Sequence, residues 1–161
     1  MCLNYMAFAT LAFATSAAKW LIRGNIALYH ITQSVCPMKT KRKTSAALRK
    51  EMEFLESLAR RCPQDVDVLK VLGDLYTRTG CYEDGLKTDL ELTKLRPREP
   101  LVWYNLACSC ALLDRTDEAL ASLERAIVLG YRDVRWIRED RDLNSLKKDQ
   151  RFEVLLQRLV T

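Results

Sequence analysis

A repeat of 34 residues in the C-terminal two-thirds of this chain restricts its fold more than any other feature. When the sequence is aligned with itself at this offset, apolar, small and acidic residues each tend to coincide with residues of the same kind. The coinciding pairs include Pro63/Pro97, Leu69/Trp103, Leu72/Leu106, Gly73/Ala107, Tyr76/Cys110, Glu83/Asp117, Gly85/Ala119, Leu86/Leu120 and Leu95/Leu129. A period of this length is typical of stacked helical pairs, since each pair buries its apolar face only against a neighbour.

The spacing of apolar residues inside each repeat is that of an α-helix. They recur three and four residues apart and so share one helix face, first at Leu69, Leu72, Gly73 and Tyr76 and then at Trp103, Leu106, Ala107 and Cys110. A glycine inside a helix lowers helix stability by about 1 kcal/mol relative to alanine, so the glycine at position 73 requires a structural explanation. We expect a second helix to cross at Gly73 and Ala107, with Gly85 and Ala119 on the other side of that contact.

Turn residues separate these helices. Gly80 and Asp114–Arg115 are predicted to end the first helix of each pair, while Pro97 and Pro100 end one pair and begin the next. The whole chain of 161 residues contains only five glycines and four prolines, which favours long helices over a sheet with many turns.

The residues Leu69-x2-Leu72-Gly73-x2-Tyr76, followed by Gly80, Tyr82, Gly85 and Pro97, resemble a tetratricopeptide repeat. A second, closer match consists of Trp103-x2-Leu106-Ala107-x2-Cys110, Ala119 and Ala126, so the resemblance covers about residues 66–131. It implies an all-α fold, a right-handed α-solenoid of helix–turn–helix repeats. Asp89 and Leu92 stand where the second repeat has the apolar Leu123 and the small Ala126. Tyr131 stands where a proline is expected from Pro97 of the first repeat. We therefore expect less regular packing in the first pair.

The flanks supply capping helices for a domain that spans 45–161. Residues 45–61 have an amphipathic pattern and form the predicted N-terminal cap, with Leu48, Met52, Leu55, Leu58 and Ala59 on one side. The repeats occupy about 66–99 and 100–133. The segment 134–161 is similar to the irregular tail that closes many bacterial tetratricopeptide proteins, and we expect it to begin with a helix around Trp136 and Ile137 and to end in another from residue 150 to 160.

The N-terminal segment 1–37 is weakly hydrophobic and allows three interpretations. It is a signal or membrane anchor, an ordinary buried helix, or untranslated sequence upstream of a true start at Met38. Residues 38–44 form a basic lead into the domain.

Basic residues are concentrated at the N-terminus. Residues 1–50 contain eight Lys and Arg and no Asp or Glu, which leaves 18 basic and 21 acidic residues in 51–161. The overall net charge of +5 therefore does not describe the domain. The basic run Lys39–Lys43 has no aromatic residue among its charges, so we expect no nucleic acid as a partner.

Residues suited to catalysis or metal binding are sparse. His30 is the single histidine, and there is no phosphate-binding glycine motif and no metalloprotease motif. We predict no enzymatic activity, no catalytic residue, no cofactor and no metal site. The cysteines have no zinc-site spacing, and we expect them to be small, buried or half-buried side chains; they are Cys2, Cys36, Cys62, Cys81, Cys108 and Cys110.

The predicted function is non-catalytic binding of another protein, as a peptide or a helix, in the concave groove that the resemblance implies. Helical phase and the resemblance place ten residues there: Lys70, Asp74, Thr77, Arg78, Tyr104, Asn105, Cys108, Leu112, Arg135 and Arg138. Some family members clamp a terminal carboxylate. Lys70 and Asn105 match that clamp and Arg135 offers a cation, but Asp74 and Glu139 stand where the clamp needs other residues. The alternative is a membrane-tethered scaffold anchored through 1–37. The expected location is cytoplasmic, or membrane-associated if that anchor is real, and no pattern indicates an oligomeric state.

Overall fold

Seven α-helices and one 3₁₀ helix make up the part of the chain that the computed structural model describes, residues 45–159. They are α1 (Ala46–Arg61), α2 (Val66–Thr79), α3 (Tyr82–Leu95), α4 (Pro100–Leu112), α5 (Thr116–Val128), α6 (Val134–Glu139), η1 (Leu146–Lys148) and α7 (Gln150–Gln157). This range contains no strand, which confirms the prediction of an all-α fold. The predictions for 1–37 and 38–44 lie outside the described residues.

The helix ends follow local sequence. Asp65 caps α2, because its carboxylate accepts hydrogen bonds from two N–H groups of the first turn, and Pro100 occupies the first turn of α4, where a missing N–H costs nothing. Gly80 ends α2 in the left-handed conformation (φ 81°), and Asp114, its counterpart 34 residues later, has φ 58°. Glycine adopts this conformation without strain and aspartate tolerates it better than most residues.

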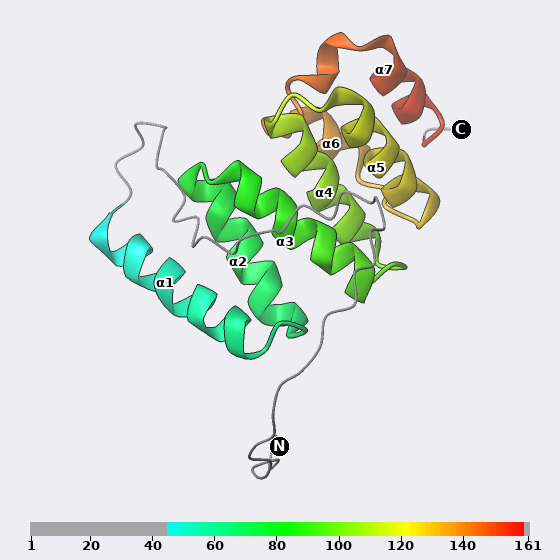
Figure 1. The fold of residues 1–161 in the computed structure, drawn as a ribbon. Coiled ribbons are helices and arrows are strands. Elements are labelled where there is room, and N and C mark those ends of the chain that lie inside the picture. Colours follow the sequence, from blue (N-terminus) through cyan, green and yellow to red (C-terminus); the bar gives the residue numbers. More distant parts are fainter. Residues whose placement is uncertain (1–44, 160–161) are drawn as a thin grey trace, which may run out of the picture. The chain divides into compact units, whose positions relative to one another are not determined.

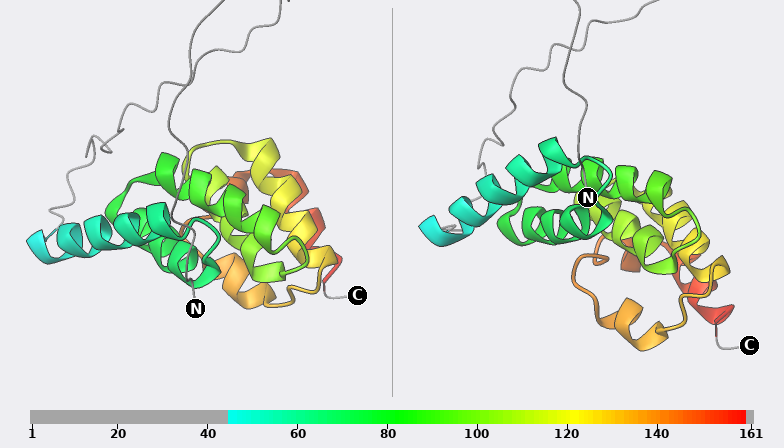
Figure 2. Two further views of the ribbon diagram at one scale, coloured as in Figure 1. Left: turned by 60° about the horizontal axis from the view of Figure 1, so that its bottom comes forward. Right: turned by 90° about the horizontal axis from the view of Figure 1, so that it is seen from below.

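The helices follow one another in space in the order of the chain. From α1 to α5 each helix packs against the next, and α7 packs against α5 and η1. Helices α2 and α4 begin 34 residues apart, and so do α3 and α5. Figures 1 and 2 show the resulting row, with α1 at one end and α7 at the other. The period in the sequence thus corresponds to a repeated pair of helices.

The small residues lie at the predicted helix crossings. A Cβ on Gly73 would lie 3.3 Å from Asp89 Oδ1 and 3.7 Å from Thr88 Cγ2, both on α3. Ala107 and Ala119 are fully buried between α4 and α5. Gly85 lies on the α3 side of the α2–α3 contact, as predicted, because the nearest atoms to a Cβ there belong to Tyr76 and Thr77 of α2 and to Ser109 of α4. The two glycines of the first pair therefore contact different turns of the facing helix, not each other.

Three apolar clusters form the core, and the first helix pair, α2 and α3, contributes to all three of them. Met52 and Leu55 of α1 pack with Leu72, Leu75 and Tyr76 of α2. A small cluster of Leu69, Leu92 and Val102 joins α2, α3 and α4, and so connects one pair to the next. The largest cluster unites Leu86 of α3 with α4, α5 and the C-terminal cap, where Ile137, Leu143, Leu146 and Leu156 are fully buried. Since the cap contributes this much apolar surface, it is part of the core as well as a cover for it.

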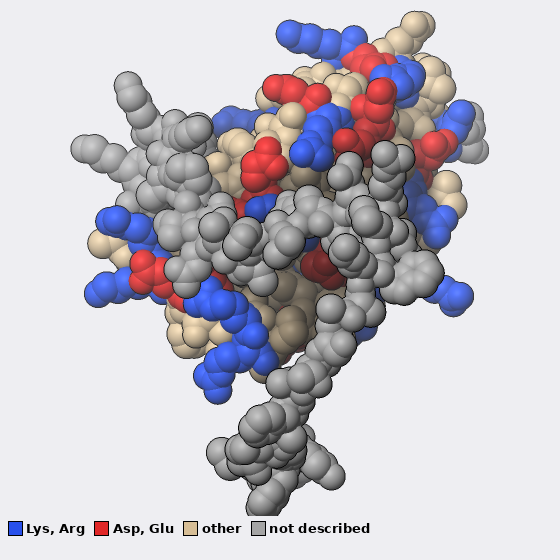
Figure 3. Space-filling view, in the orientation of Figure 1, with Lys and Arg blue, Asp and Glu red and all other residues tan. Residues whose placement is uncertain are grey.

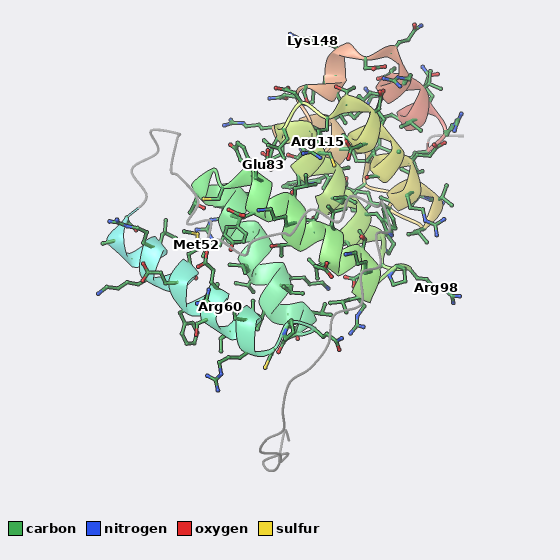
Figure 4. The ribbon with its side chains drawn as sticks, in the orientation of Figure 1. Met52, Arg60, Glu83, Arg98, Arg115 and Lys148 are labelled. Atoms are coloured by element: carbon green, nitrogen blue, oxygen red, sulfur yellow. The ribbon has the colours of Figure 1, made fainter. Side chains whose placement is uncertain are left out.

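Ion pairs cover the surface between the helices. Glu83 at the start of α3 and Arg115 just before α5 approach to 3.9 Å, and Figure 4 shows them side by side. On the face in Figure 3, Lys and Arg side chains are interspersed with Asp and Glu. Cys81, Cys108 and Cys110 are buried as predicted, but Cys62 is exposed because it follows the last turn of α1, where the chain turns toward α2.

Among residues 45–159, none of the helices combines the length and hydropathy required to cross a bilayer.

Candidate binding cavity

A cavity of about 410 Å³ opens along the first helices of the successive pairs. Its wall comes from α2, α4 and α6, with one contribution from α3 and others from the residues that follow α5 and α6. The lining residues are Gly73, Asp74, Thr77, Asp89, Leu101, Tyr104, Asn105, Cys108, Tyr131, Trp136, Asp140 and Asp142.

Five of the ten residues predicted for the groove line this cavity: Asp74, Thr77, Tyr104, Asn105 and Cys108. Their helical phase was sufficient to find them, because residues three or four positions apart on α2 and α4 lie on one face. Tyr104 and Cys108 are buried and form its floor, whereas Asp74 is exposed at its edge.

The other five predicted residues do not line the cavity. Lys70 is paired with Glu99 at 2.6 Å, and Leu112 is half-buried near the end of α4. Arg78 lies outside the lining, although it forms an exposed ion pair with Asp74, which does line it. Two arginines of α6 bind acidic side chains on the domain surface: Arg135 binds Glu139, and Arg138 forms a bidentate pair with Glu153.

The floor of the cavity is an aromatic and acidic cluster. The rings of Tyr104 and Tyr131 stack in parallel, with their centroids 4.4 Å apart. The Tyr104 hydroxyl donates a hydrogen bond to Asp140 Oδ2, and the Cys108 thiol approaches the same oxygen at 3.7 Å. The other carboxylate oxygen, Oδ1, accepts the backbone N–H of Asp142. These bonds hold the carboxylate in place and tie the segment after α6 to α4.

Burial and negative charge raise the pKa of the groups in this cluster. For the Cys108 thiol, burial is the main cause of the raised pKa, and the nearby Asp140 and Asp142 carboxylates add to it. The pKa of Tyr104 and that of Tyr131 are raised mainly by burial as well, with a contribution from Asp140 to each. A thiol with a raised pKa remains protonated and is a poor nucleophile, so Cys108 is not suited to covalent catalysis.

Asp89 of α3 is a buried carboxyl group in the wall. It is only 5% exposed, and its Oδ2 accepts a hydrogen bond of 2.5 Å from the Ser109 hydroxyl of α4. Burial raises its pKa to about 6, although the hydrogen bond from Ser109 acts in the opposite direction. The glycine at position 73 leaves room for this carboxyl between α2 and α3.

The predicted groove did not include Asp89 and six further lining residues, one of which, Gly73, was assigned to a helix crossing. Leu101 could have been found, because it precedes Tyr104 and Asn105 by three and four positions on α4. Tyr131, Trp136, Asp140 and Asp142 carry no such signal, since they belong to the irregular part of the chain after α5, where the 34-residue period ends. Trp136 is 55% exposed despite its size.

Within the described range, no three His, Cys, Asp or Glu side chains converge in a way that would hold a metal ion. A second cavity, of about 510 Å³, lies between α5 and α7, and its lining includes Leu120, Val154 and Leu155 together with Arg151 and Arg158.

No family model matches the sequence. The chain is similar to a chloroplastic protein of Arabidopsis thaliana, with 31% identity over 107 residues, or 65% of this chain. The aligned stretch covers 31% of that relative, so the chain spans about a third of the relative's length.

Proposed function

We propose that residues 45–159 are a tetratricopeptide-type solenoid that binds an extended segment of another protein in the cavity lined by α2, α4 and α6. The 34-residue spacing of helix starts supports the repeat assignment. So does the burial of matching positions: Leu72 and Leu106 are both buried, and so are Gly73 and Ala107.

One observation carries the binding function. The cavity is continuous along the first helices of successive pairs and has two large apolar side chains at its surface, Leu101 (48% exposed) and Trp136 (55% exposed). Exposed apolar and aromatic side chains beside polar groups are typical of peptide-binding grooves. Helical repeat proteins present such surfaces on their concave side. The proposed mode of action is non-catalytic and needs no cofactor.

Photo-crosslinking tests this proposal. Benzoylphenylalanine placed at Leu101 lies in the cavity wall, and we expect it to crosslink a protein partner in the cell that makes this chain. The matched control is the same substitution at Leu90 of α3, which is 43% exposed and does not line the cavity. Mass spectrometry of the adduct identifies the partner segment. Absence of a protein adduct at position 101, or equal adducts at both positions, would contradict the proposal.

Residues 1–50 suggest where the domain acts. They contain no acidic residue, and transit peptides are likewise poor in acidic residues. The similar protein of Arabidopsis thaliana is described as chloroplastic. We propose an organelle-targeting leader as a further account of this segment, beside a membrane anchor and a cytoplasmic protein with a start at Met38.

Fusing residues 1–50 to a fluorescent protein separates these accounts. A targeting leader is expected to direct the fusion to an organelle and to be shortened there, which N-terminal mass spectrometry detects. If the segment is a membrane anchor, the fusion protein is expected at full length in the membrane fraction. If translation starts at Met38, no peptide from residues 1–37 is expected.

A further inference from the structure

We propose that the cavity receives an arginine side chain from a basic segment of the partner protein. This inference rests on the proposed function and adds to it the chemistry of the partner. It follows from the charge of the cavity wall, from the bonding of its carboxylates, and from the exposed face of Trp136.

The charge of the wall is one-sided. Four of the twelve lining residues are aspartates, Asp74, Asp89, Asp140 and Asp142, and none is a lysine, arginine or histidine. On the face of the domain in Figure 3, by contrast, side chains of opposite charge are interspersed. A cleft lined by charges of one sign concentrates ligands of the opposite sign. A negatively charged peptide terminus is therefore a poor occupant.

The Asp140 carboxylate forms no ion pair within residues 45–159, although the Lys147 ammonium binds the backbone carbonyl of the same residue at 2.9 Å. Within residues 45–159, its carboxylate is bound by neutral donors: the Tyr104 hydroxyl, the Cys108 thiol and the backbone N–H of Asp142. These bonds orient the carboxylate without neutralising it. At the edge of the cavity, Asp74 is paired with Arg78 on the exposed face of α2, at 3.3 Å. Exposed pairs of this kind contribute little, so an incoming arginine can replace Arg78 at small cost.

An aromatic surface lies beside these carboxylates. Trp136 lines the cavity and exposes more than half of its surface. Indole rings attract guanidinium groups, and this domain already contains such a contact, with the Arg125 guanidinium 5.9 Å from the ring centre of Trp103. Leu101 adds apolar surface for the methylene groups of a long side chain.

Arginine fits this set of contacts better than the alternatives. Its planar guanidinium stacks on an aromatic ring and donates hydrogen bonds to a carboxylate at the same time. A lysine ammonium does the second without the planar stacking. A metal ion needs convergent ligands, and the described side chains do not offer such a group.

Selection from a random dodecapeptide phage library against the full chain tests the inference and does not require the partner to be identified first. We expect the selected peptides to contain arginine at one shared position. Replacing that arginine with glutamine is expected to weaken binding to the chain about tenfold or more, because a charge-assisted bond is lost. Selected peptides without a basic residue, or with acidic ones, would overturn the proposal.

Matched variants locate the site. Asp140→Asn keeps an acceptor for Tyr104 but removes the charge, and we expect about tenfold weaker binding of the selected peptide. Trp136→Ala is expected to weaken it about three- to tenfold. The controls are Glu91→Gln on the exposed surface of α3 and Phe54→Ala, which removes an aromatic ring that is 62% exposed on α1. Losses as large in the controls as in the cavity variants would contradict the assignment.

Two outcomes separate this inference from the proposed function. A crosslink at position 101 to a partner segment without basic residues overturns the arginine inference and leaves the protein-binding function standing, whereas no crosslink removes both.

The basic run Lys39–Lys43 of the chain itself is the competing occupant of the cavity. If replacing its four basic residues, Lys39, Lys41, Arg42 and Lys43, with glutamine strengthens peptide binding severalfold, the cavity is filled by the chain's own segment and the proposal of a partner arginine fails.

Discussion

Ala107→Leu is expected to lower the free energy of unfolding by about 1–3 kcal/mol. Ala107 is fully buried, and its neighbours in the core, Ala119 and Leu123 of α5, are also 0% exposed. A leucine adds three carbon atoms where α4 and α5 pack closely. The side chain then has to leave its preferred rotamer or push the helices apart, and both cost free energy. Urea unfolding followed by circular dichroism measures the change.

The control for this substitution is Ala121→Leu. Ala121 is exposed on α5 and borders the open cavity between α5 and α7, so the same added atoms find free space, and we expect a change within about 0.5 kcal/mol. If both variants unfold at the same urea concentration as the parent protein, α4 and α5 do not pack closely at Ala107, and the small residues of the repeat have another explanation.

Asp89→Asn is expected to raise the free energy of unfolding by about 1–3 kcal/mol at pH 8. The carboxyl group is buried, and its pKa is raised from 3.8 to about 6 in the folded protein. Above that pH the folded state has to hold a charge away from water, which costs free energy. Asparagine removes the charge and retains an oxygen that can accept the hydrogen bond from Ser109.

The sign of the pH dependence follows from the same values. Between about pH 4 and pH 6 the folded state binds the Asp89 proton more tightly than the unfolded chain does, so this group makes stability fall as the pH rises through that range and level off above it. The asparagine variant lacks this contribution. We therefore expect the two proteins to have similar stability near pH 4 and to diverge by pH 8.

Urea unfolding of both proteins at pH 4, 6 and 8 provides the comparison. Glu91→Gln, on the exposed face of the same helix, controls for the loss of one negative charge and is expected to change stability by less than about 0.5 kcal/mol at pH 8. An asparagine variant that is less stable than the parent protein at pH 8 would show that the bond between the carboxylate and Ser109 outweighs the cost of burying the charge.

The sequence determined the helices of this domain and their order. Periodicity of three and four residues comes from the geometry of a single helix, and the starts of α2 to α5 follow the 34-residue spacing because each pair repeats the same local contacts. The small residues at 73 and 107 could be assigned to helix crossings for the same reason. Capping and turn residues such as Gly80 and Pro100 also act within a few positions of the helix ends that they define.

The composition of the cavity was decided by tertiary structure. Tyr104 and Asp140 are 36 residues apart in the chain, and their contact depends on where the irregular tail folds back onto α4. That tail has no repeat to extrapolate from, so the sequence did not reveal that Trp136, Asp140 and Asp142 would join residues of α2 and α4. The pairing of Lys70 with Glu99 and of Arg135 with Glu139 was hidden as well, because helical phase indicates which side of a helix a residue occupies but not which charge lies within its reach.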